Sequence, residues 1–93
     1  MAIRITHRRM SPGGTRHEHI VSVKWTNEGS GESGSNTVAE IVDFIDNKNG
    51  KAYVAEGGTR IDVGTVHPHQ GHAYIRTFRD STPTDNLLHL PTY

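Results

Sequence analysis

Apolar and polar residues alternate most regularly between residues 17 and 26. Every second side chain of this segment is apolar, aromatic or histidine, and these residues share one face of an extended strand: His17, His19, Val21, Val23 and Trp25. A shorter alternation at residues 3–7 predicts another strand, followed by a turn at residues 11–14. Residues 27–36 are rich in glycine and serine without any periodicity, so we expect a flexible loop there.

A helix is expected directly after this loop. Residues 37–40, Thr-Val-Ala-Glu, match a capping box, in which the Thr37 hydroxyl accepts a hydrogen bond from the Glu40 amide. The apolar residues that follow have the i, i+3, i+4, i+7 spacing of an amphipathic helix, widened by one aromatic ring: Val38, Ile41, Val42, Ile45 and Phe44. Asn-Gly at residues 49–50 favours a left-handed cap, so the helix should end near residues 47–50.

Two strands with a tight turn are predicted next. Residues 51–56 and 59–66 flank Gly57-Gly58, whose glycines accept the positive φ of a two-residue hairpin loop. Pairing Glu56 with Thr59 places apolar residues of the two strands opposite each other on one face of the sheet.

A further strand is expected to pair with the second strand of this hairpin, after a loop at residues 67–71. The hydrophobic pattern then places Val63 opposite Ile75 and Asp62 opposite Arg76. The predicted fold class is α+β: an antiparallel sheet of about five strands with one helix packed on one face, in a single domain over residues 1–93.

The amino-acid composition argues against some classes of function and favours others. Lysine plus arginine and aspartate plus glutamate number 10 each, so the chain has no basic field for general nucleic-acid binding. Seven of the basic residues are arginine, which favours a small phosphate-bearing ligand as partner. Cysteine is absent, and no apolar run resembles a signal peptide or approaches the roughly 20 residues of a membrane span. We therefore expect a cytoplasmic protein without membrane contact.

The sheet face opposite the helix is the first candidate site. The expected register places aromatic and charged side chains of three strands there: Tyr53, Asp62, Tyr74, Arg76 and Phe78. Such a surface can stack a planar ring and pair with a phosphate. In the alternative interpretation, Asp62 and Arg76 form a cross-strand ion pair that only stabilises the sheet.

The tail and a glycine-rich loop add further candidates. Arg76, Arg79, Asp85 and Asn86 could line a cleft, or Asp85 and Asn86 could form a turn that aims three leucines at the core. Arg16 follows a Gly-Gly turn whose amides could wrap an anion. The complete set of expected ligand-binding residues is Arg76, Tyr74, Tyr53, Asp62, Arg79, Asp85, Asn86, His17, His19 and Arg16.

Two His-x-His pairs raise the question of a metal site. In a strand, a His-x-His pair such as His17 and His19 places both imidazoles on one side, as many zinc sites require. His67 and His69 have the same spacing in the expected loop, and His72 follows them. Nothing in the spacing brings the two pairs together, so structural histidines are the expectation, with no metal and no cofactor. No Ser-His-Asp arrangement or closely spaced carboxylate pair is evident, so an enzyme stays an open alternative without a motif to support it, and a protein without catalysis is favoured.

Several of these motifs resemble one family over nearly the whole chain. They are His17-Glu18-His19-Ile20, Trp25, Tyr74-Ile75-Arg76-Thr77 and the segment from Asp85 to Pro91. Together they resemble the domain of unknown function family 3892. The resemblance implies occurrence in bacterial and phage genomes and a compact stand-alone domain, and it implies no activity or catalytic residue.

Three functions are compatible with these features. The first is a non-enzymatic small-ligand-binding protein, in one version a phage protein that sequesters a nucleotide-derived immune signal. The second is a protein-interaction module that uses a sheet edge or the aromatic face. The third is a small metalloprotein or enzyme that uses the histidines. For any of these functions a homo-oligomer is attractive, because pairing gives a small domain more core and a deeper pocket.

Overall fold

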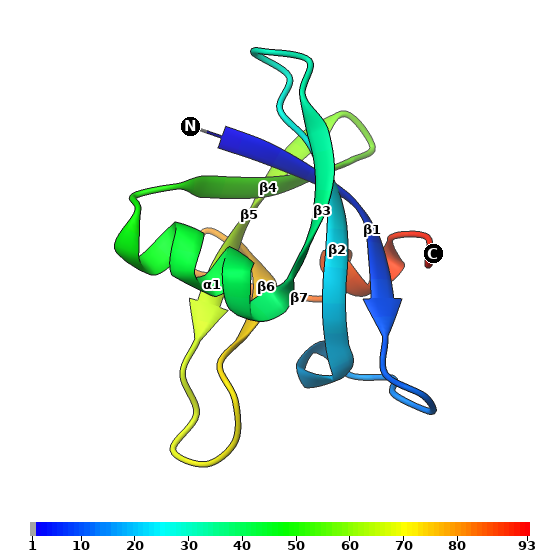
Figure 1. Cartoon of the computed structure of the whole chain (residues 1–93), viewed down its shortest axis with the longest axis vertical. Coiled ribbons are helices and arrows are strands. Elements are labelled where there is room, and N and C mark those ends of the chain that lie inside the picture. The colour runs from blue at the N-terminus through cyan, green and yellow to red at the C-terminus, as the bar shows by residue number, and fades with distance from the viewer. Residues whose placement is uncertain (1) are drawn as a thin grey trace.

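Seven strands form one sheet in the computed structural model, which describes residues 2–93 (Figure 1). In chain order they are β1 (Ala2–Met10), β2 (Ile20–Thr26), β3 (Ser33–Thr37), β4 (Lys51–Glu56), β5 (Thr59–Val66), β6 (Tyr74–Arg79) and β7 (Thr82–Thr84). Their order across the sheet is β3-β2-β1-β4-β5-β6-β7, with β1 parallel to β4 and all other neighbours antiparallel. One α-helix, α1 (Val38–Asn47), and two 3-10 helices, η1 (His17–His19) and η2 (Asn86–His89), complete an α+β fold, as predicted.

The predicted number of about five strands is too low because β3 and β7 carry no hydrophobic signal. β3 has the sequence Ser-Gly-Ser-Asn-Thr and falls largely within the segment expected to be a flexible loop, and β7 is a three-residue strand in a polar turn. Both lie at the edges of the sheet, where a strand needs hydrogen bonds to only one neighbour and buries little apolar surface.

Helix α1 begins and ends as predicted. The Thr37 hydroxyl accepts from the Glu40 amide at 3.2 Å, and Glu40 Oε1 accepts from the Thr37 amide at 3.0 Å. Beyond the helix, Asn49 has a left-handed φ of 53°, and the Gly50 amide donates to the Phe44 carbonyl oxygen at 2.9 Å.

The predicted hairpin of β4 and β5 is confirmed. Glu56 pairs with Thr59, and both glycines of the turn between them have positive φ. Val54 and Ile61, which lie opposite each other, are both buried. Turn chemistry and hydrophobic pattern therefore favour the same register.

Between β5 and β6 the predicted register is wrong by two residues. Asp62 lies opposite Phe78, Val63 lies opposite Thr77, and Arg76 lies opposite Gly64, so the expected pairing of Asp62 with Arg76 does not occur. A shift of two residues keeps every side chain on its own face of the sheet, and the hydrophobic pattern therefore cannot distinguish the two registers.

The strand expected over residues 17–26 is instead a 3-10 turn, η1, followed by β2. Ile20 is buried and Val21 is 43 % exposed, which reverses the predicted faces of these two residues. The faces differ because β2 has a bulge at Val21. Ile20 pairs with Met10 and Ser22 pairs with Arg9, so Val21 is the extra residue and turns toward solvent. Val23 is buried, as predicted.

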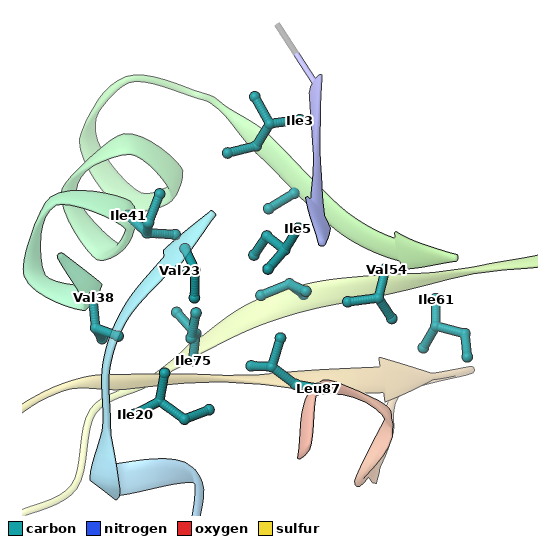
Figure 2. Close-up of a cluster of buried hydrophobic side chains, with 12 residues drawn as sticks. Ile3, Ile5, Ile20, Val23, Val38, Ile41, Val54, Ile61, Ile75 and Leu87 are labelled. Carbon is teal, nitrogen blue, oxygen red and sulfur yellow. The ribbon is translucent and has the colours of Figure 1, made fainter. Parts of the chain in front are cut away.

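The apolar core lies between the sheet, α1 and η2. Figure 2 shows Val38 and Ile41 of α1 and Leu87 of η2 converging on side chains of the strands. Leu87 is fully buried, and Leu88 and Leu90 pack against the cluster, which confirms that the three leucines close one side of the core.

After η2 the chain returns to β1, beside which the C-terminus lies (Figure 1). The Arg8 amide donates to the Pro91 carbonyl oxygen at 3.0 Å, and the Tyr93 amide donates to the Arg8 carbonyl oxygen at 3.1 Å. Residues 2–93 contain no helix with the length and hydrophobicity needed to cross a bilayer.

Candidate ligand-binding site

A pocket of about 420 Å³ opens between α1 and the end of the sheet formed by β1, β2 and β3. Its lining comes from these strands, from the helix and from the helix C-cap: Ile3, Trp25, Asn36, Ala39, Glu40, Ile41, Asp43, Phe44 and Lys48. Small-molecule sites typically have volumes of about 300 to 1,000 Å³ and combine apolar walls with a few polar groups. The pocket meets both criteria.

Two aromatic rings form the walls of this pocket, and each lies against a glycine. Trp25 Nε1 donates to Asn36 Oδ1 at 2.7 Å, and a Cβ at Gly34 would lie 3.1 Å from the Trp25 ring. On the other side, a Cβ at Gly50 would collide with the Phe44 ring. Rings that are held in place and half-buried in this way can stack on a planar ligand.

The rim of the pocket is acidic on balance. Hydrogen bonds from the Thr37 amide, then from the Thr37 hydroxyl and the Asn36 side chain, lower the pKa of Glu40, which is therefore ionised at neutral pH. Lys48 Nζ lies 3.7 Å from Asp43 Oδ2. With two carboxylates beside one ammonium group, the rim favours ligands that present N–H donors over ligands that carry several negative charges.

Three of the predicted ligand-binding residues meet beside β6: Arg76, Asp85 and His17. Arg76 Nη2 donates to Asp85 Oδ1 at 3.2 Å and to the Thr84 carbonyl oxygen at 3.3 Å. His17 Nε2 lies 3.9 Å from the same Asp85 oxygen. Because Asp85 already compensates the Arg76 charge, a phosphate at Arg76 would compete with this carboxylate.

His17 is the buried member of this cluster. Its side chain is 8 % exposed, and its Nε2 has no hydrogen-bond partner within residues 2–93. Burial lowers the pKa of His17, and the Arg76 charge adds to this effect, whereas Asp85 and Glu18 act in the opposite direction. A neutral imidazole contributes no charge for binding an anion.

Other predicted residues make contacts outside this cluster. His19 Nδ1 accepts from the backbone amides of Thr15 and Arg16, so the His19 ring orders its own loop. Asn86 donates to Glu56 at the end of β4. These contacts assign His19 and Asn86 to local structure, while the Arg16 side chain is exposed.

Four predicted residues are distributed over the sheet. Tyr53 of β4 lies opposite Asp62 of β5, whereas Tyr74 and Arg79 occupy the two ends of β6. The ten predicted residues therefore do not form one site.

The histidine pairs do not assemble a metal centre in the described part of the chain. No group of three or more metal-ligating side chains is found within residues 2–93. His67 Nε2 instead contacts Asp46 Oδ2 at 2.7 Å, next to the Thr65 hydroxyl, which donates to Asp46 Oδ1.

Comparison with protein families supports the resemblance seen in the motifs. A family model described as a protein of unknown function matches residues 3–91, nearly the whole chain. The chain belongs to the DUF3892 family. Comparison with curated proteins and with solved structures found no match.

The sequence did not single out the aromatic pocket of this DUF3892 protein as a site. The sequence marks Trp25 as a strand residue and as part of the family resemblance, Phe44 as part of the apolar helix face, and Asn36 as part of a loop. A usable signal is the pairing of the sole tryptophan with Gly34, because a glycine has no side chain that would displace the ring lying against it. That signal requires β3 to be recognised as a strand.

Proposed function

We propose that this protein is a non-enzymatic binding protein for a small, nucleotide-derived ligand, whose planar ring enters the pocket between Trp25 and Phe44. The observation that carries the proposal is the pocket of about 420 Å³ with two aromatic walls and a polar rim. The pocket lining contains no serine, cysteine or histidine. Its ionisable side chains make structural contacts, Glu40 with Thr37 and Lys48 with Asp43.

The polar residues at the rim favour a nucleobase as the part of the ligand that enters the pocket. Glu40 and Asp43 can accept hydrogen bonds from the amino and ring N–H groups of a nucleobase. Lys48 supplies one positive charge at the mouth, which suits a single phosphate better than a polyphosphate. A phage protein that sequesters a nucleotide-derived immune signal needs affinity and no chemistry, and this kind of pocket would serve that role.

Intrinsic fluorescence offers a direct test because Trp25 is the only tryptophan. We expect adenosine, AMP, ADP-ribose or a cyclic dinucleotide to change the Trp25 emission saturably and to raise the melting temperature by mass action. The Ala39→Phe variant fills the pocket from the exposed side of α1 and should weaken binding at least tenfold.

The control is Ala55→Phe, which adds the same ring at an exposed alanine of β4 outside the pocket. This variant should bind like the wild type. If none of the four ligands gives a saturable signal, or if both variants lose binding equally, the pocket is not the site of a nucleotide-derived ligand.

The outer edge of β3 favours a second candidate function. β3 is an edge strand of the sheet, and its residues 33–35 are exposed. The backbone N–H and C=O groups on its outer side can therefore pair with a strand of another protein or of a second copy of this chain. Light scattering at increasing protein concentration tests self-association. A constant monomer mass would leave only pairing with a different protein, which pull-down from a host lysate would examine.

A further inference from the structure

A second cluster of interest lies on the face of the sheet that points away from α1. Arg4 of β1 pairs with Tyr53 of β4, and both residues alternate with buried core residues of their strands. Arg60 of β5 places its guanidinium carbon 3.9 Å from the centroid of the Tyr53 ring. Two arginines and one phenol therefore converge on this face.

The acidic partner of this cluster comes from a different part of the chain. Glu28, in the connection between β2 and β3, accepts a hydrogen bond from the Tyr53 hydroxyl at 2.6 Å. Arg60 Nη2 donates to the same Tyr53 oxygen at 2.8 Å. The Tyr53 hydrogen bond is the largest cause of a lowered pKa of Glu28, and the charges of Arg4 and Arg60 add to it.

Glu28 does not satisfy all the donors around it. Arg4 Nε is inaccessible to water and has no hydrogen-bond partner within residues 2–93, because Glu28 Oε1 is 3.7 Å away, beyond hydrogen-bonding distance. The Tyr53 hydrogen bond and the contact with Arg4 both fall on the same oxygen of Glu28. Two arginines and one glutamate leave one net positive charge, which Asp62, opposite Tyr53 on the same face of the sheet, balances.

The β2–β3 connection that carries Glu28 is held by hydrogen bonds of its own and does not depend on the contact of Glu28 with Tyr53. The Asn27 amide donates to the Glu32 carbonyl oxygen at 2.6 Å, and Asn27 Oδ1 accepts from the Gly29 and Ser30 amides. Rotation of the Glu28 side chain alone can therefore vacate the cluster without opening the β2–β3 connection, and that side chain is already about half exposed, at 50 %.

We propose that Arg4, Tyr53 and Arg60 form a binding site for a phosphate group, and that Glu28 occupies this site as an internal competitor. A phosphate monoester presents three oxygens, which can take the Tyr53 hydroxyl, the unpaired Arg4 Nε and the Arg60 guanidinium from different directions. This site lies on the opposite face of the sheet from the Trp25 pocket and does not depend on the proposed function.

The test is the binding of inorganic phosphate to Glu28→Gln, measured by calorimetry. The substitution keeps the size of the side chain and removes the competing charge, so the variant should bind phosphate at least tenfold more tightly than the wild type. Adding Arg60→Gln to this variant should remove the gain. Glu32→Gln, which deletes an equal charge from the same connection, should bind like the wild type.

A second measurement uses the unaltered protein and does not depend on the folding of any variant. The carboxyl carbon of Glu28 can be titrated by NMR with and without phosphate. When phosphate takes the Tyr53 hydroxyl, the pKa of Glu28 should rise toward its ordinary value. An unchanged Glu28 titration in saturating phosphate, or equal phosphate affinities of Glu28→Gln and Glu32→Gln, would overturn the proposal.

Discussion

At the scale of single residues, His17 couples the folding of this protein to pH. Its ring is buried beside Arg76, with Asp85 and Glu18 as acidic neighbours, and its pKa in the folded state is below the ordinary value of 6.5. The unfolded chain therefore takes up a proton at His17 before the folded chain does. The stabilisation that depends on neutral His17 is fully present above the ordinary pKa of 6.5. It is lost as the pH falls from this value toward the lower pKa of the folded state.

The His17→Gln variant should show this directly. We expect its free energy of unfolding to change less than that of the wild type between about pH 7 and about pH 5, because glutamine does not titrate. Urea denaturation at several pH values measures the difference. His69→Gln, in the exposed loop between β5 and β6, should keep the wild-type slope, and the same slope in His17→Gln would refute the assignment.

A separate loss of stability belongs to a more acidic range. Glu28, Glu40 and Glu56 all have pKa values lowered below the ordinary 4.5 by hydrogen bonds in the folded state. Their contributions are present above that value and are lost as the pH falls through the folded pKa values. The His17 effect can therefore be measured without interference from these carboxylates.

At the scale of the elements, the start of α1 links helix stability to the candidate site. The capping box between Thr37 and Glu40 satisfies backbone donors at the helix N-terminus, and Glu40 also belongs to the rim of the aromatic pocket. A change at the cap should therefore affect the helix first and the pocket through it.

Removing the cap hydroxyl should have a measurable cost. We expect Thr37→Ala to lower the free energy of unfolding by about 1 kcal/mol, because the Glu40 amide loses its acceptor. Thr37→Ser keeps a hydroxyl at the same place and should retain most of the stability. Urea denaturation distinguishes the two variants, and equal losses would show that the methyl group of Thr37 matters rather than its hydroxyl.

At the scale of the whole molecule, the C-terminal segment joins two regions of the sheet. η2 supplies Leu87 to the core, Glu56 of β4 contacts His89 at 3.0 Å, and the last residues pair with β1 near Arg8. Since Leu87 is fully buried among residues of several strands, its truncation should weaken the entire fold rather than η2 alone.

We expect Leu87→Ala to lower the free energy of unfolding by about 2 to 5 kcal/mol, the range for a large side chain removed from a packed core. Val21→Ala, at a position that is 43 % exposed, should cost less than about 0.5 kcal/mol. Denaturant unfolding followed by Trp25 fluorescence measures both variants. Similar small losses would mean that η2 is not part of the cooperative core.

Much of the fold could be predicted because its signals are local. The capping box at Thr37 and the Gly57-Gly58 turn each depend on a few neighbouring residues, and both are found where expected. The edge strand β3 and the turn η1 were missed because neither has a hydrophobic period of its own. The shifted pairing of β5 with β6 was missed because a shift of two residues preserves the faces of both strands.

The candidate sites, like the fold, could be predicted from the sequence only in part. Arg76, Asp85 and His17 were all proposed from sequence and do come together, but only the structure shows that Asp85 already compensates the arginine. The aromatic pocket and the Glu28 contact with Tyr53 join segments that are distant along the chain.

The sequence by itself determined the helix with its cap, the tight hairpin and the faces of the central strands, because hydrogen bonds and side-chain periodicity within a few residues specify them. The tertiary structure decided which side chains meet across the sheet, which arginines are already neutralised and where a pocket remains open. Those outcomes depend on how α1, η2 and the β2–β3 connection dock on the sheet, and docking is set by packing between segments that no local pattern records.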